Sequence, residues 1–127
     1  MANYCSNIVE FREFRADRDT LAKLRMMFLQ LALAETSTGL GQLPDNYVRD
    51  HGFMFNIRWD LDMLYYETKW EPNIQVLIFI ADHHKADFIC NYEESAMSVY
   101  GEAEYRNGIL RNVHLNEDDF NQYRLDE

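Results

Sequence analysis

Four glutamates in two pairs, Glu93 with Glu94 and Glu102 with Glu104, are the best candidates for acid–base chemistry in this sequence. A hairpin between the pairs would bring them close together, and crowded carboxylates raise one another's pKa toward the range that general acid–base catalysis uses. The alternating pattern of residues 97–106, however, places Glu102 and Glu104 on a solvated strand face. We interpret the four glutamates as an acidic patch, because structural charge clusters are commoner than catalytic ones.

Residues 82–87, with the sequence Asp-His-His-Lys-Ala-Asp, gather the most side chains that ligate metals. Neighbouring histidines on a helix point about 100° apart, so they cannot close on one ion as a pair four residues apart can. The run is instead typical of a helix C-terminus, where His and Lys side chains meet the negative end of the helix dipole. We therefore predict no metal site.

The two cysteines, Cys5 and Cys90, match neither a zinc pattern nor a disulfide framework. An iron–sulfur cluster needs about four cysteine ligands, which this chain does not have. The serines and glycines form no nucleophile elbow, phosphate loop or dinucleotide fingerprint. The sequence therefore predicts buried thiols and no cofactor, and it favours a protein that is not an enzyme.

The chain has 127 residues, a net charge of -10 and 47% hydrophobic residues, which predicts a single domain over residues 1–127. Its excess negative charge repels phosphate backbones and anionic lipid, so we expect no direct contact with nucleic acid and none with a membrane. No stretch approaches the roughly 20 apolar residues that span a bilayer, and the first residues lack the pattern of a secretion signal. These features predict a cytoplasmic protein.

Hydrophobic spacing divides the chain into strands and helices. It predicts a helix at residues 18–35 and strands at residues 4–14, 53–59, 63–70, 87–94, 97–106 and 109–115. Residues 73–84 fit both a helix and a strand, and the preceding Pro72 and the length of the segment favour the helix. Residues 36–52 form a long loop rich in turn residues, and residues 116–127 are either a short helix or a frayed tail.

The order strand, helix, strand, strand, helix, strand matches a split βαβ sandwich of the α+β class. We expect a mostly antiparallel sheet with two helices on one face and one or two appended C-terminal strands. Asn107 and Gly108 are a strong signal for a two-residue hairpin between the last two strands.

Three short segments carry recognisable motifs: Asn-Tyr-Cys-Ser-Asn at 3–7, Tyr-Glu-Thr-Lys-Trp-Glu-Pro at 66–72, and Tyr-Glu-Glu-Ser-Ala-Met-Ser-Val-Tyr-Gly at 92–101. Together they resemble the YubB-like ferredoxin-like domain family of plasmid, phage and bacterial proteins. Here Tyr4 replaces the family's usual Trp, and Ser95-Ala96 stands where the family has Pro-Gly. The resemblance implies a ferredoxin-like fold and a mobile-element or bacterial origin, and it implies no activity.

Aromatic residues crowd the middle third of the chain, in greater number than one buried sheet face can cover. Most of them belong in the core, and the remainder could form a groove or a subunit contact, where Tyr and Trp are enriched. The candidates for such an interaction surface are Tyr47, Trp59, Tyr66, Trp70, Phe120 and Tyr123.

The sequence favours a non-catalytic interaction domain that presents its sheet or its helical layer to another copy or to a protein partner. One alternative is an acidic mimic of DNA that occupies the basic groove of a host defence enzyme, which requires carboxylates at near-phosphate spacing. A second alternative is a small-ligand-binding domain or an enzyme that uses the loop of residues 36–52.

Overall fold

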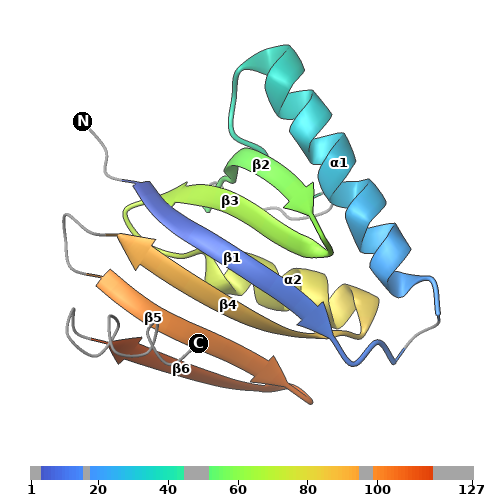
Figure 1. The fold of residues 1–127 in the computed structure, drawn as a ribbon, viewed down its shortest axis with the longest axis vertical. Helices are drawn as coiled ribbons and strands as arrows, with labels where there is room; N and C mark the ends of the chain where they lie inside the picture. The colour runs from blue at the N-terminus through green and yellow to red at the C-terminus, as the bar shows by residue number, and fades with distance from the viewer. Residues whose placement is uncertain (1–3, 16–17, 45–51, 95–98, 116–127) are drawn as a thin grey trace.

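The computed structural model describes residues 4–15, 18–44, 52–94 and 99–115. They form a six-stranded antiparallel sheet and two helices (Figure 1). The elements are β1 (Tyr4–Arg12), α1 (Thr20–Thr38), β2 (Phe55–Asp60), β3 (Met63–Lys69), α2 (Ile74–His84), β4 (Asp87–Glu94), β5 (Val99–Arg106) and β6 (Ile109–Leu115). The strands lie in the order β2-β3-β1-β4-β5-β6.

This topology confirms the predicted fold class. Elements β1 to β4, with α1 and α2 between them, are a ferredoxin-like split βαβ sandwich, and β5 and β6 are the appended strands. Asn107 and Gly108, with φ of 51° and 81°, form the predicted two-residue turn between β5 and β6.

Strand β1 alternates between two environments. Cys5, Asn7, Val9 and Phe11 are buried, whereas the side chains between them are exposed or half-buried. A period of two is expected for a strand when helices cover only one face of the sheet. In Figure 1 helix α2 lies behind the strands, and the uncovered side of the sheet faces the reader. Ile8 lies on this uncovered side, because its neighbours Asn7 and Val9 are buried on the other. We call this side the open face.

Helix α1 ends later than the sequence predicted. We expected residues 18–35, but the helix runs over Thr20–Thr38. In its last turn the hydroxyls of Thr36 and Thr38 donate to the carbonyls four residues earlier, at 3.0 and 2.8 Å, which spares them from competing with the helix in another conformation. Gly39, with φ 70°, then ends the helix. The predicted loop therefore starts at Gly39, and its residues 45–51 lie outside the described residues, as does the predicted tail of residues 116–127.

Backbone conformation also shortens two predicted strands. Strand β1 stops at Arg12 because Glu13 takes φ 52°, and β3 stops at Lys69 because Trp70 takes φ 70°. Left-handed backbone departs from the extended conformation that regular strand pairing needs. Such conformations at non-glycine residues leave no signal in hydrophobic spacing, so the sequence placed both ends too late.

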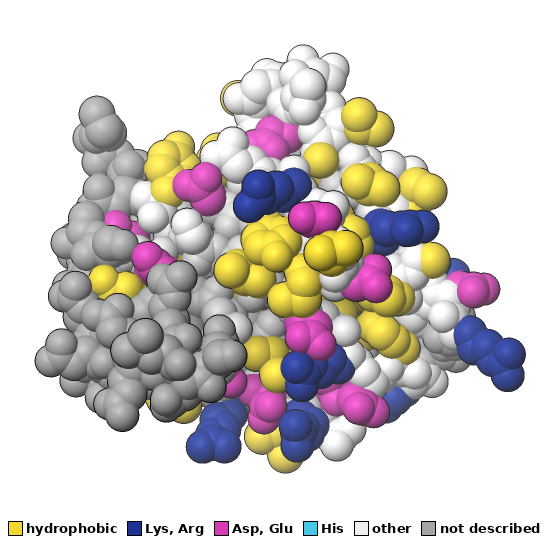
Figure 2. Space-filling model, in the orientation of Figure 1, with side chains coloured by type: hydrophobic (Ala, Val, Ile, Leu, Met, Phe, Trp, Pro, Cys, Tyr) yellow, Lys and Arg dark blue, Asp and Glu magenta, His cyan; other side chains and the backbone are white. Residues whose placement is uncertain are grey.

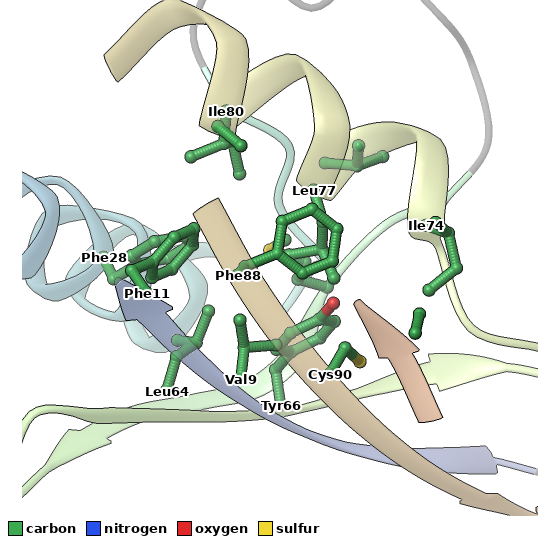
Figure 3. Packing of buried hydrophobic residues seen from close by; sticks show 14 of the residues in the cluster. Val9, Phe11, Phe28, Leu64, Tyr66, Ile74, Leu77, Ile80, Phe88 and Cys90 are labelled. Carbon is green, nitrogen blue, oxygen red and sulfur yellow. The ribbon is translucent and has the colours of Figure 1, made fainter. Parts of the chain in front are cut away.

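Helix α2 resolves the ambiguous segment at residues 73–84 in favour of the helix. Its buried residues are Ile74, Val76, Leu77, Ile80 and Ala81, which share one helical face. Figure 3 shows Leu77 and Ile80 pointing from α2 toward Phe88 on β4. Full burial of each such side chain contributes about 1.5–3 kcal/mol, so this face fixes the helix against the sheet.

The C-terminus of α2 is closed by backbone hydrogen bonds. Lys85 takes φ 53°, and the amide of Ala86 donates to the carbonyl of Ala81 at 2.9 Å. This geometry satisfies a carbonyl that would otherwise lack an intrahelical partner. His83 and His84 lie in the last turn of the helix, as predicted from the charge pattern.

Strands β4 and β5 approach closely at Gly101, which lies opposite Tyr92. A Cβ built at position 101 would overlap the Tyr92 side chain and would lie 2.6 Å from the carbonyl oxygen of Val113. The Tyr92 hydroxyl extends over the glycine to donate to Asn112 Oδ1 at 2.7 Å. Because Gly101 has no side chain, Tyr92 has room to cross it and to link β4 to β6.

The first prediction concerns this close approach. We expect Gly101→Ala to lower the free energy of unfolding by about 1–3 kcal/mol, because the added methyl overpacks the Tyr92 ring. Urea denaturation measures the change, with Ile109→Ala as the control, since Ile109 is 72% exposed and exposed substitutions usually stay within about 0.5 kcal/mol. Equal stabilities of Gly101→Ala and the wild type would contradict the packing described here.

Candidate functional site

The open face has an apolar centre made of Ile8, Met63, Tyr65 and Ile89. The register places them on one side of the sheet, because Ile8 pairs with Tyr65 and Glu10 pairs with Ile89. Ile8 is 38% exposed, and the other three are half-buried. Figure 2 shows yellow side chains gathered near the middle of this face, with charged groups around them.

Charges of both signs surround the apolar centre. The register puts the acids Glu10, Asp60, Glu67, Asp87, Glu93, Glu102 and Glu104 on this face, interleaved with the bases Arg12, Arg58, Lys69, Arg106 and Arg111. Arg58 packs over the Tyr65 ring, with its guanidinium carbon 4.8 Å from the ring centroid. In a chain whose net charge is -10, this face is close to electrically balanced.

The predicted acidic patch is divided between the two sides of the sheet. Glu93, Glu102 and Glu104 lie on the open face, but Glu94 lies on the helix side and is 3% exposed. Adjacent residues of a strand point to opposite faces, so Glu93 and Glu94 cannot belong to one surface. Glu104 also pairs with Arg106, at 3.3 Å, so the remaining acids are not a run of unbalanced charge.

The predicted aromatic surface is also corrected by the structure. Trp59 is half-buried and stacks on Phe28 of α1, with ring centroids 6.0 Å apart. Tyr66 is 2% exposed and donates its hydroxyl to Asn73 Oδ1 at 2.5 Å. Both belong to the core, because their positions on β2 and β3 point toward the helices. Tyr47, Phe120 and Tyr123 lie outside the described residues.

Trp70 is the predicted aromatic that the described structure leaves at the surface, with 50% exposure. It follows β3 and takes φ 70°, and the amide of Glu71 donates to the carbonyl of Lys69 at 2.8 Å. These two features define a γ-turn centred on Trp70, a rare and strained conformation for a non-glycine residue. The turn directs the chain from β3 into α2.

A cleft of about 550 Å³, which we call the aromatic cleft, lies where β2 and β3 meet the start of α2. Its lining includes the aromatic residues Phe53, Phe55 and Trp70 together with Lys69 and Asn73. The ammonium of Lys69 lies 5.3 Å from the centroid of the Phe55 ring. Sequence reasoning found Trp70 but missed the cleft, because its walls come from residues 52–55 and 68–76.

A network of buried polar groups supports the aromatic cleft from below. Asn73 accepts from the Tyr66 hydroxyl and donates through Nδ2 to the carbonyl of Gly52 at 2.9 Å. The Thr68 hydroxyl donates to the carbonyl of Glu71 at 2.7 Å and accepts from Nδ2 of Asn7 at 3.1 Å. Because buried polar groups are costly unless they are hydrogen-bonded, this network fixes the backbone on both sides of the cleft.

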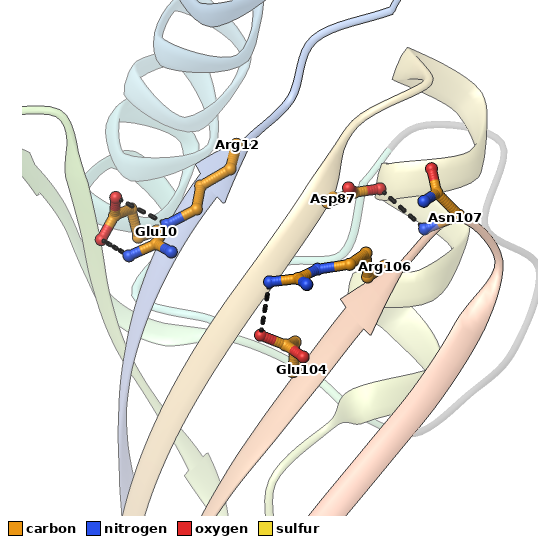
Figure 4. Close-up of polar contacts among 6 residues, drawn as sticks. All are labelled: Glu10, Arg12, Asp87, Glu104, Arg106 and Asn107. Atoms are coloured by element: carbon orange, nitrogen blue, oxygen red, sulfur yellow. Dashed lines mark hydrogen bonds and ion pairs between the residues drawn. The ribbon is translucent and has the colours of Figure 1, made fainter.

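A smaller cleft of about 370 Å³ lies at the opposite end of the sheet and is lined by Arg12, Arg15, Asp87 and Arg106 among others. Asp87 is 5% exposed and accepts from Nη1 of Arg15 at 2.6 Å and from the amide of Asn107 at 3.1 Å. Figure 4 shows Arg12 paired with Glu10, Arg106 with Glu104, and Asp87 with the turn at Asn107. Each of these guanidiniums has a carboxylate partner, so the cluster joins strand ends and offers no free cation.

The cysteines are buried, as predicted, on the paired strands β1 and β4. Burial raises the pKa of Cys5 from 9.0 to about 11, although hydrogen bonds with the Glu93 backbone and with the Thr68 side chain oppose the shift. Burial also raises the pKa of Cys90, and it raises that of Tyr92 to about 12. A thiol with a raised pKa is a poor nucleophile at neutral pH, which argues against thiol chemistry at either position.

Two kinds of feature are missing from the part of the chain that the structure describes. No group of three or more His, Cys, Asp or Glu side chains gathers there as a metal site would require. Neither helix, over those same residues, is long and apolar enough to cross a membrane.

The pKa of His84 is lowered by burial and by the charges of His83 and Lys23.

The second prediction follows from the raised pKa of Cys5. A group that binds its proton more tightly in the folded state stabilises the fold below its unfolded pKa, and this stability is lost as pH rises. We expect the free energy of unfolding to fall between pH 9 and about 11, by roughly 2 kcal/mol from Cys5 alone. Urea denaturation across this range measures the slope. A Cys5→Ala variant should show a shallower slope, and equal slopes would contradict the assignment.

The third prediction concerns the strained turn at Trp70. We expect Trp70→Gly to leave the free energy of unfolding unchanged or to raise it by up to about 1 kcal/mol, because glycine adopts positive φ without the steric cost of a side chain. Half of the indole is exposed, so little packing is lost. Thermal and urea denaturation measure the effect. A loss of more than about 2 kcal/mol would show that Trp70 is a core residue.

Comparison with known proteins gives one family. The family model described as "Ferredoxin-like domain in Api92-like protein" matches residues 49–127, which include β2 to β6 and more than half of the chain. No curated protein and no solved structure matched the chain. The order of the strands agrees with the family's description, since β3 and β4 flank β1 and β2 pairs with β3, as in a ferredoxin-like sheet. The chain therefore belongs to the family of the ferredoxin-like domain in Api92-like proteins.

Proposed function

We propose that this protein is a non-catalytic interaction domain whose binding surface is the open face, and that its partner there is a second copy of the chain. The observation that carries the proposal is the apolar centre at Ile8, Met63, Tyr65 and Ile89, surrounded by charges of both signs. Protein interfaces commonly combine an apolar centre with a polar rim.

The charge balance of the open face favours a second copy. A chain with a net charge of -10 repels another copy over most approaches. On the open face the acids alternate with bases, so two copies related by a twofold axis can place Arg12 or Arg58 against acids of the partner. Self-association through this face therefore meets less like-charge repulsion than the net charge of the chain would by itself produce.

The size of the face sets how much of it such a contact would use. Six strands spaced about 4.8 Å apart, each with about seven residues of about 3.3 Å, cover a flat area of roughly 670 Å². Stable interfaces bury about 800 Å² of accessible surface on each partner, so the whole open face would take part.

The same charge pattern disfavours the alternative of a DNA mimic. Such a mimic needs acids at near-phosphate spacing over one surface. On the open face Arg106 stands beside Glu104 and Arg12 beside Glu10, so the described acids form no continuous negative ridge there.

Two finer expectations belong to this proposal. We infer a relationship to the YubB-like group, with a mobile-element origin, from the motifs at residues 3–7, 66–72 and 92–101. We also infer a cytoplasmic location, which is supported by the free, buried thiols of Cys5 and Cys90.

The fourth prediction tests the interface. We expect the wild type to form a dimer at micromolar concentration in sedimentation equilibrium. Ile8→Glu should weaken the dimer at least about tenfold, because it places a charge in the apolar centre.

The matched control is Leu33→Glu, which introduces the same charge at a residue of α1 that is 70% exposed. Leu33→Glu should leave the dimer unchanged, and circular dichroism should show that both variants fold. A wild type that stays monomeric across the concentration series would overturn the proposal, and so would equal weakening by the two variants.

A further inference from the structure

We propose that the aromatic cleft binds a small planar aromatic carboxylate. The cleft opens where β2 and β3 meet α2, and its volume of about 550 Å³ falls within the roughly 300–1,000 Å³ of ligand sites. The cleft lies outside the apolar centre of the open face and shares Lys69 and Phe55 with the edge of that face, so ligand binding and dimerisation are measured separately.

The walls of the cleft favour a planar ring. Phe53 is 38% exposed, Trp70 is 50% exposed and Phe55 is half-buried, and all three line the cleft. Pro72 and Ile74 add apolar surface. Large aromatic side chains are usually buried, and exposed ones that converge on a concavity offer a ring the offset or edge contacts that aromatic pairs prefer.

The charge inside the cleft favours an anion. In the described part of the chain the ammonium of Lys69 contacts the Phe55 ring, at 5.3 Å, rather than a carboxylate. The first amides of α2, at Ile74 and Gln75, precede the intrahelical acceptors, and no acidic residue lies in that turn. A carboxylate between Lys69 and this helix end would meet a cation and the positive end of the dipole.

Glu71 is the opposing charge, and it also lines the cleft. Its side chain is exposed, while its backbone is held by the Lys69 carbonyl and the Thr68 hydroxyl. Lys69 is exposed as well, so solvent screens both charges. The arrangement predicts opposite effects for changes at Lys69 and at Glu71, which a purely apolar site would not show.

The backbone at Trp70 supports a binding role for this residue. Strained conformations persist only where the surrounding structure imposes them, and they cluster at ligand sites. Here the network of Thr68, Asn73 and Tyr66 holds the turn, and the result is an indole that is displayed at the cleft rather than packed in the core.

The experiment uses naphthoate as the probe and its uncharged amide, naphthamide, as the matched control. The chain has two tryptophans, so proton–nitrogen NMR spectra report on each indole N–H, and Trp70→Phe assigns the two signals. We expect naphthoate to shift the Trp70 signal and to leave that of Trp59 in place. Naphthoate should bind about two- to fivefold more tightly than naphthamide, as expected for a partly exposed charge pair.

Variants separate the charged groups. Lys69→Met should abolish the preference for naphthoate over naphthamide, while Lys23→Met, on α1, should retain it. Glu71→Gln should strengthen naphthoate binding and leave naphthamide binding unchanged. An unshifted Trp70 signal would overturn the proposal, and so would equal affinities of the two probes for the wild type or an unchanged preference in Lys69→Met.

An aromatic ring and a carboxylate also occur together at the C-terminus of a peptide that ends in an aromatic residue. Comparing the binding of N-acetyl-phenylalanine with that of naphthoate distinguishes such a peptide from a free aromatic acid. Tighter binding of N-acetyl-phenylalanine would support a peptide carboxylate in this cleft, and tighter binding of naphthoate would support a free aromatic acid.

Discussion

The position of β1 between β3 and β4 is the constraint on which the other features depend. Val9 lies opposite Leu64 on one side and opposite Cys90 on the other, so a single strand contributes to both halves of the core. The same alternation that buries Val9 places Ile8 on the open face. A shift of one residue along either neighbour would exchange these two sets of side chains, so the core and the proposed interface are specified together.

The fold was largely predictable because its signals are local. Asn107 and Gly108 identify the β5–β6 turn, and the apolar spacing of Ile74, Leu77 and Ala81 identifies α2. Strand ends were less predictable, since β1 and β3 stop at Glu13 and Trp70 through left-handed backbone that hydrophobic spacing does not reveal. Whether residues 1–127 are one domain stays a prediction.

The surfaces were harder to predict than the fold because they depend on which face a residue takes. Glu93 and Glu94 are identical in type, yet Glu93 is half-buried on the open face and Glu94 is buried on the opposite side of the sheet. Trp59 and Trp70 are similarly alike in sequence and opposite in environment. The aromatic cleft needs residues from both sides of the β2–β3 hairpin, and nothing local in the sequence joins Phe53 to Trp70.

The amide of Asn7 is buried in the middle of the sheet, where its Nδ2 reaches the Cys5 carbonyl at 3.1 Å, the Tyr66 carbonyl at 3.4 Å and the Thr68 hydroxyl. Any other alignment of β1 with β3 would leave this amide without acceptors in an apolar layer. A leucine at position 7 would tolerate misalignment far better. Asn7 thus makes the pairing of β1 with β3 specific. It adds little to the stability of the native pairing, but it raises the energy of pairings that are shifted along the strand.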